Sequence, residues 1–232
     1  MANNKTVNPA ALKAADAVAF QLVGRASPVR FGRAQSQDQI EAIYRLRCRI
    51  VIERGWARLE DLPDGMERDA DDANAVHIAA WEGDALAGTA RLVLPSPGRL
   101  LPTEKAFGLD PNLAGHVADV GRICVSQEWT SPQHLVWLGL VGQIWIEMRS
   151  FGFLAASTIL TPAVARVYRR WGLEVISLGA SRPFWNEERF PGLIQPADSV
   201  GRGLRTIQAA SGSVIENIAP RPGSLRAVMC PR

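Results

Sequence analysis

Strand-like and helix-like segments follow one another along most of the chain, and this order constrains the fold more than any other feature of the sequence. Apolar alternation and short apolar runs indicate strands, whereas apolar residues spaced three and four apart indicate helices. Strands are expected over residues 29–34, 76–81, 86–94, 117–126, 154–160 and 173–178, and helices over 36–54, 132–151 and 162–171. The order predicts an α/β (α+β) chain in which helices cover the faces of one mixed sheet.

The chain is long enough for one domain with an appendage. We expect residues 1–28 to form an N-terminal extension, with one amphipathic helix over residues 9–23 laid on the domain. A single domain is expected over 29–195, followed by a C-terminal extension over 196–232. In that extension, 200–210 is a weak helix candidate and 220–232 is typical of a mobile tail.

Composition excludes several classes of protein. The 26 basic and 23 acidic residues give a net charge of +3, which is too balanced for a dedicated nucleic-acid binder. No apolar stretch reaches the length of a membrane-spanning helix, so stable membrane insertion is not expected. The three cysteines and three histidines are scattered without metal-ligand spacing, which predicts no metal and free thiols in a reducing cytoplasm.

Charged residues stand at unusual places. Arg47 lies within the apolar face of a predicted helix, and Arg91 lies within a predicted strand. Residues 55–74 form a long polar loop that carries Glu67, Asp69 and Asp72. Charges in apolar segments are costly unless they are paired. Either these side chains form a partly buried ion-pair network that braces the loop against the sheet, or they form a functional site.

Asp119 and Arg122 lie in one predicted strand, three residues apart. In a regular strand this spacing points two side chains to opposite faces. Gly121 lies between them and permits a β-bulge, which would bring both side chains to one face.

Taken together, these residues resemble the motifs of the acyl-homoserine-lactone synthases, the autoinducer synthases among the GNAT-like acyltransferases. Arg47 and Trp56 match the opening motif, in which Val51 replaces an aromatic residue. Asp119 stands where the family has glutamate. The other matching segments are Glu67-x-Asp69-x-x-Asp72, Gly88-Thr-Ala-Arg91-Leu, Asp119-x-x-Arg122, Leu160-Thr-Pro162 and Tyr168-Arg-Arg-Trp171-Gly172-Leu.

The resemblance covers roughly residues 29–180 and implies a GNAT-like fold and acyl transfer without a cofactor. A thioester would acylate the amine of S-adenosylmethionine, and lactone closure would yield an acyl-homoserine lactone, a quorum-sensing signal. By this resemblance and its chemistry, Asp119 would act as general base and Tyr168 would protonate the leaving thiolate. The substrate-binding residues would be Arg47, Trp56, Asp69, Asp72, Arg91 and Arg122, with an oxyanion hole of backbone N–H groups around 123–125.

The donor and the product stay open. Residues 127–134 contain no glycine, unlike the pyrophosphate loop of common GNAT enzymes, which favours acyl carrier protein over acyl-coenzyme A as donor. The alternatives in function are an N-acyl amino acid synthase of the same fold without lactonisation and a non-catalytic GNAT-like binding module. Trp137 and Trp145 share a helix face, which suits either a core or the lining of an acyl tunnel.

Overall fold

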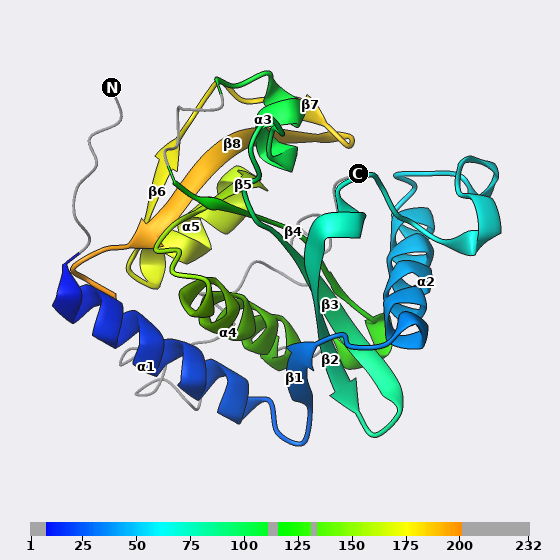
Figure 1. Ribbon diagram of the computed structural model, residues 1–232, viewed down its shortest axis with the longest axis horizontal. Helices are drawn as coiled ribbons and strands as arrows, with labels where there is room; N and C mark the ends of the chain where they lie inside the picture. The colour runs from blue at the N-terminus through cyan, green and yellow to red at the C-terminus, as the bar shows by residue number, and fades with distance from the viewer. Residues whose placement is uncertain (1–7, 111–115, 131–133, 201–232) are drawn as a thin grey trace.

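The computed structural model describes residues 8–110, 116–130 and 134–200, and Figure 1 shows their arrangement. One sheet runs through the molecule in the strand order β1-β2-β3-β4-β5-β8-β6, with β7 paired to β8. Among the strand pairings of the described residues, only that between β4 and β5 is parallel. The strands are β1 (Arg30–Arg33), β2 (Ala75–Glu82), β3 (Ala85–Val93), β4 (Ala118–Val125), β5 (Ala156–Leu160), β6 (Leu173–Ser177), β7 (Arg182–Phe184) and β8 (Glu187–Pro196).

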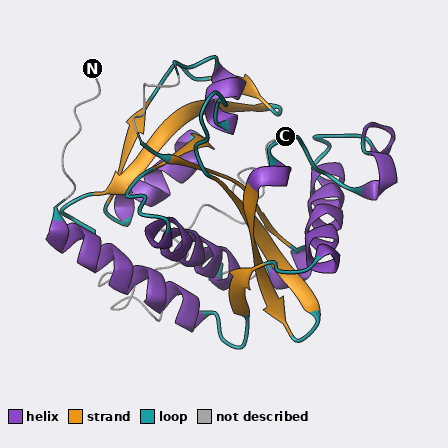
Figure 2. Ribbon diagram, in the orientation of Figure 1, coloured by secondary structure: helices purple, strands orange, loops and turns teal. Residues whose placement is uncertain are grey.

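Five α-helices are present in the described part of the chain, and Figure 2 distinguishes them from the strands. Ser36 caps the second helix by accepting from the backbone N–H of Gln39, as its position in the sequence predicts. The predicted start of the long helix at Pro132 falls outside the described residues. The helices are α1 (Pro9–Arg25), α2 (Gln37–Glu53), α3 (Pro102–Phe107), α4 (Leu135–Ser150) and α5 (Pro162–Arg170).

The expected mixed sheet, the helices on its faces and the N-terminal helix are confirmed. The polar loop is more ordered than expected, because it contains three short 3₁₀ turns, Leu59–Asp61, Pro63–Gly65 and Asp72–Asn74. The helix and tail candidates beyond residue 200 fall outside the described residues. No helix of the described ranges is both long enough and apolar enough to cross a bilayer.

Strands β7 and β8 are absent from the prediction. The segment from Glu187 to Arg189 is charged, and Pro191 and Gly192 disfavour a strand, so the local pattern is weak. β8 forms because it pairs with β5 on one side and β6 on the other. Pro191 is tolerated because the β6 pairing ends at Gly192. Beyond that point the Pro191 carbonyl accepts from the backbone N–H of Leu178, and no N–H is needed from Pro191 on that side.

The two faces of the sheet carry different helices. Ile78 and Ala80 of β2 pack in the same core cluster as Leu140 and Ile144 of α4, whereas Ala79 packs with α2. The period-two alternation of the strand therefore separates an α4 face from an α2 face. Figure 1 shows α2 on one side of strands β2 to β4, and α1 and α4 on the other.

Strands β4 and β5 part soon after they meet. Their pairing is limited to Ala118 with Ala156 and Asp119 with Ser157. Farther along β4, a bulge against β3 places one extra residue between Gly121 and Cys124, and Arg122 there has φ of 53°. The strands therefore diverge on the C-terminal side of Asp119, and this opening positions the site described next.

Candidate active site

Arg47 of α2 is the first anchor of a buried ion-pair network. Its guanidinium donates to both carboxylate oxygens of Asp72, at 2.7 and 3.0 Å, and its Nε donates to Glu67 Oε2 at 2.5 Å. Arg47 is fully buried, as are both partners. A bidentate, charge-assisted contact of this kind fixes the orientation of both groups. Arg47 thus ties α2 to the loop that precedes β2.

Arg91 and Arg122 close the network from the sheet. Arg91 Nη1 lies 2.7 Å from Asp69 Oδ1 and 3.2 Å from Asp72 Oδ1. Arg122 Nη2 lies 2.7 Å from Asp69 Oδ2 and 2.9 Å from Glu67 Oε1. Three guanidinium groups therefore face three carboxylates. Asp69 is the exposed member, since 28% of its side chain is accessible.

The network keeps Asp72 and Asp69 ionised. Burial by itself would raise the pKa of Asp72, but the hydrogen bonds and charge of Arg47, together with the charge of Arg91, hold that pKa below its usual range. Burial is also outweighed at Asp69, where the charges of Arg122 and Arg91 lower the pKa. The ion-pair network that braces the loop against the sheet, one of the two interpretations that the sequence left open, is present in the structure. Substrate binding by these residues stays a prediction.

The predicted bulge brings Asp119 and Arg122 to the same face. Val120 and Ile123 pack in the core cluster of the α4 face, so the residues that precede each of them point toward the α2 face. The positive φ belongs to Arg122, whereas the expected position of the irregularity was Gly121. Within the described residues, Arg122 pairs with Glu67 and Asp69 rather than with Asp119.

Asp119 occupies the point where β4 and β5 part. Its Oδ2 accepts from the backbone N–H of Thr103 at 3.0 Å and from the hydroxyl of Ser157 at 2.9 Å. Burial raises the pKa of Asp119 to about 6, although these hydrogen bonds and the charge of Arg91 oppose the rise. A carboxyl group with this pKa is largely ionised at neutral pH and accepts a proton more readily than an exposed aspartate.

Thr103 and Ser157 are supporting residues that sequence reasoning missed. Thr103 lies in α3, a helix of six residues that the sequence indicates only weakly, and Ser157 looks like an ordinary strand residue. Ser157 reaches Asp119 because β5 pairs with β4, and the fold brings Thr103 to the same carboxylate. No local sequence pattern reveals either contact.

Trp56 packs against an apolar cluster that includes Val51 of α2, and its ring contacts a different element. Its ring meets Trp185 edge to face at 5.4 Å, and the guanidinium of Arg189 lies 5.2 Å from its centroid. Trp185 and Asn186 have φ values of 57° and 58° and form the turn between β7 and β8. Sequence reasoning missed Trp185 and Arg189 because it missed the hairpin that carries them.

Tyr168 lies on the α4 face of the sheet, opposite to the ion-pair network. It is buried in α5, where its ring stacks on Trp137 at 6.1 Å and meets Trp171 edge to face at 6.1 Å. Burial raises the pKa of Tyr168 well above its ordinary value. The structure thus places Tyr168 in an aromatic cluster apart from Asp119, and its predicted role as proton donor remains a prediction.

An apolar cavity of about 100 Å³ lies on the α4 face. Tyr168 and Trp171 line the cavity. Strand β4 contributes Val120 to the lining, and β5 contributes Ala156 and Thr158. Trp145 also lines it, whereas Trp137 packs behind Tyr168. The remaining lining residues are Ala15, Val18, Ala19, Leu22, Val141, Gly142, Ile144, Met148, Leu173, Ile194, Gln195, Pro196 and Val200.

The cavity and Asp119 lie back to back on the same strands. Val120, which lines the cavity, directly follows Asp119 in β4. In β5, Ser157 bonds Asp119 and stands between the cavity residues Ala156 and Thr158. Strand alternation therefore separates an apolar compartment from a buried carboxylate by the thickness of the sheet, at the place where the sheet opens.

Comparisons with solved structures identify the fold. The acyl-homoserine-lactone synthase LasI has 20% identity and a TM-score of 0.57, over 72% of this chain and 88% of that one. BjaI, a coenzyme A-dependent acyl-homoserine lactone synthase solved with S-adenosylmethionine and isopentyl-coenzyme A, has 22% identity and a TM-score of 0.55, over 75% and 83%. FeeM, an N-acyl amino acid synthase from uncultured soil microbes, has 14% identity and a TM-score of 0.55, over 72% and 90%.

These structures have the GNAT-like acyltransferase fold, which confirms the fold expected from the motifs. No curated protein sequence matches the chain. The model of the N-acyl amino acid synthase FeeM family matches residues 42–188, which is more than half of the chain. This stretch contains every site residue expected from the sequence. The chain therefore belongs to the FeeM family of N-acyl amino acid synthases and is an acyltransferase.

Proposed function

We propose that the protein transfers an acyl group from a thioester to the α-amino group of an amino acid and releases an N-acyl amino acid and a free thiol. The observation that carries this proposal is the back-to-back arrangement of the apolar cavity and Asp119 where β4 and β5 part. An acyl chain suits the apolar compartment, and an amine suits the charged one. The thioester would lie between them, in the opening of the sheet.

Asp119 is the proposed general base. An α-amino group has a pKa near ~8, so much of it is protonated at neutral pH and must lose a proton before attack. Asp119 would take that proton, directly or through water, while the amine nitrogen bonds to the thioester carbon. The tetrahedral nitrogen then gives up its second proton to solvent as the carbon–sulfur bond breaks. The thiolate takes a proton from Tyr168, the proposed donor, which recovers a proton from solvent, so that one proton is released overall. Backbone N–H groups around Ile123 to Val125 would stabilise the oxyanion.

The acceptor is proposed to lie on the α2 face. Asp69 is the network carboxylate with substantial exposure, so it is the candidate to contact the ammonium group of the acceptor. Asp72 and Arg47 are buried and act through the geometry they impose. Arg91 and Arg122 hold Asp69 in place, and Trp56 would form an aromatic wall with Trp185.

A second candidate is acyl-homoserine-lactone synthesis from S-adenosylmethionine. The spacing from Arg47 to Arg122 resembles the motifs of that family, and this resemblance favours the candidate. After acylation, the carboxylate of the acceptor would displace the sulfonium and close the lactone, with release of methylthioadenosine. The two candidates share the acylation step and differ in this second step. No cofactor is required by either.

Acyl carrier protein is the proposed donor and acyl-coenzyme A is the alternative. The segment between β4 and α4 lacks the glycines of a usual pyrophosphate loop. Arg166, Arg169 and Arg170 are exposed on α5, where they offer a basic surface to an acidic carrier. Since acyl thioesters are intracellular metabolites, we propose that the enzyme acts in the cytoplasm.

The test combines product analysis in cells with purified components. Lipids of cells that express the protein are analysed by mass spectrometry, and the purified enzyme is assayed for thiol release with matched acyl thioesters, amino acids or S-adenosylmethionine. We expect N-acyl amino acids and no methylthioadenosine. Methylthioadenosine formed with an acyl-homoserine lactone would establish the second candidate instead. Absence of thiol release with every donor and amine would contradict both.

A further inference from the structure

The helix α1 lies outside the residues that match the family model, yet it completes the apolar cavity. Leu22 of α1 packs against Leu138 of α4 and Trp171 at the end of α5. Ala15 belongs to a cluster that contains Trp145 of α4 and Leu173 of β6. The helix therefore packs along α4 and reaches Trp171 at the end of α5, and it covers the cavity on the side away from the sheet.

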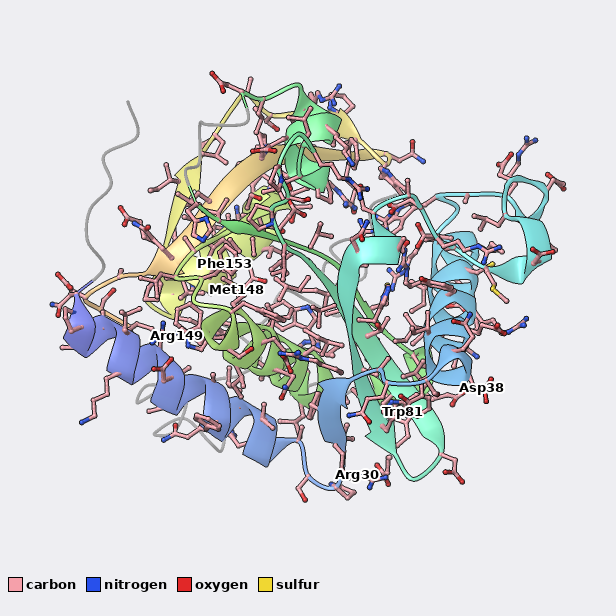
Figure 3. All side chains as sticks on the ribbon, viewed as in Figure 1. Arg30, Asp38, Trp81, Met148, Arg149 and Phe153 are labelled. Atoms are coloured by element: carbon pink, nitrogen blue, oxygen red, sulfur yellow. The ribbon has the colours of Figure 1, made fainter. Side chains whose placement is uncertain are left out.

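This cover is closely fitted. A Cβ atom on Gly142 of α4 would lie 2.7 Å from the carbonyl oxygen of Ala19, so glycine permits the close approach of the two helices. Asp16 accepts from Trp145 Nε1 at 2.7 Å and from Arg149 Nε at 3.2 Å. Figure 3 shows Arg149 together with Met148, a lining residue, on the part of α4 that lies beside α1.

The inner face of α1 leaves space where larger residues would fill it. Ala15, Val18, Ala19 and Leu22 line the cavity, and two of these four residues are alanines. The wall also includes Trp171, whose indole N–H is buried without a hydrogen-bond partner in the described part of the chain. A cavity with a cover of small residues suits an apolar ligand, since a packed core fills such space.

From this arrangement we propose that α1 is the end wall of the acyl site and that Ala15 and Ala19 set the longest acyl chain the enzyme accepts. The inference rests on the proposed function, because the occupant is taken to be the acyl chain of the thioester. The chain would enter at the parted strands, near Val120 and Thr158, and extend away from the sheet until it meets α1. The length limit thus lies in a segment that the family match does not contain.

The first test shortens the site. Ala15→Leu and Ala19→Leu are compared with wild type on a series of straight-chain acyl thioesters that differ by two carbons. Because a clash of one methylene changes acceptance by roughly 10–200-fold, we expect kcat/KM for the longest good substrate to fall at least about tenfold. Shorter substrates should stay near wild-type rates. Ala17→Leu is the matched control, because Ala17 is exposed on the same helix.

The second test lengthens the site and guards against misfolding of the first variants. Leu22→Ala should shift the optimum toward a longer chain, while melting temperatures identify any variant that has lost its fold. Identical length profiles for Leu22→Ala, Ala19→Leu and Ala17→Leu would overturn the proposal.

A binding measurement separates this inference from the proposed function. Displacement of a fluorescent fatty-acid probe by straight-chain fatty acids needs neither an acceptor nor turnover. We expect the length at which binding falls to move with Ala19→Leu and Leu22→Ala, even if no acyl transfer is found. Unchanged binding profiles, together with unchanged kinetics, would overturn the role of α1 while leaving acyl transfer intact.

Discussion

The two faces of the sheet differ in chemistry, because one carries a buried ion-pair network and the other carries an apolar cavity. The α2 face holds Arg47, Arg91 and Arg122 against three carboxylates, and each contact has a defined geometry. The α4 face holds a cavity lined by apolar side chains from α1, α4, α5 and the strands. The charged face depends on a few pairings that must all be made. The apolar face depends on volume, which many combinations of residues can supply.

The difference teaches where each kind of substitution should act. Removing one partner from a buried ion pair leaves a charge without compensation, whereas a change in cavity volume alters which ligand fits. The charged face should therefore respond with loss of activity or stability. The apolar face should respond with a change in specificity.

The largest effect is expected from Asp119→Asn. The amide keeps the size of the side chain but cannot accept the proton of the amine, so kcat/KM should fall about 10²–10⁴-fold. Steady-state kinetics and thermal melting check this together. Ser157→Ala is the matched comparison, because it removes one hydrogen bond to Asp119 and leaves the carboxyl group. Near-native activity of Asp119→Asn with a normal melting curve would rule out the general base.

The same residue predicts a pH dependence. Since the pKa of Asp119 is raised to about 6 in the folded state, from 3.8 ordinarily, kcat/KM should rise with pH through about 6 as the carboxylate forms. The stability contribution has the opposite slope. The folded state binds the proton more tightly, so the free energy of unfolding should fall as pH rises from about 4 to about 6. Asp119→Asn should remove both slopes.

Arg47→Met tests the network as a structural frame. It leaves Asp72 and Glu67 buried without their main partner, so we expect a loss of about 3–5 kcal/mol in the free energy of unfolding by urea. Arg45→Met is the matched control on the same helix. Arg45 is exposed, and its ion pair with Glu41, at 3.6 Å, lies on the surface. That control should change stability by less than about 1 kcal/mol. Equal effects of the two substitutions would contradict a structural frame.

The paired substitutions Asp69→Asn and Asp72→Asn sharpen the comparison within the charged face. From the sequence, both residues are expected to serve the acceptor, so KM for the acceptor should rise in each while KM for the donor changes little. Because Asp72 is fully buried and Asp69 is partly exposed, the Asp72 variant should lose more stability than the Asp69 variant. An effect confined to the acyl donor would contradict the assignment.

The smallest effect is expected from Arg169→Glu with Arg170→Glu. These exposed charges should mainly change the association rate with acyl carrier protein, by about tenfold or less, and most at low salt. Arg45→Glu with Arg49→Glu, on α2, is the matched charge reversal on the other face. Stopped-flow or initial-rate assays with the same acyl group on coenzyme A give the second comparison. A wild-type preference for acyl-coenzyme A would contradict carrier-protein donation.

Much of the charged site could be predicted from the sequence, because charged residues are unusual within apolar segments. Arg47, Arg91 and Arg122 stand out against their neighbours, and the polar loop marks their partners. Strand and helix periods also give most elements between residues 29 and 178. By contrast, β7 and β8 lack a local pattern, so Trp185 and Arg189 could not be associated with Trp56.

The sequence by itself determined the order of most elements between residues 29 and 178, the residues of the ion-pair network and the position where a bulge was permitted. Only the tertiary structure decided that Asp119 meets Thr103 and Ser157, that Tyr168 lies on the opposite face, and that α1 covers an apolar cavity. The physical reason is the sequence separation of the residues that interact. Periodicity and unpaired charge act along a few residues, whereas strand pairing and packed volume depend on segments far apart in the chain, whose apolar side chains look alike until they are brought together.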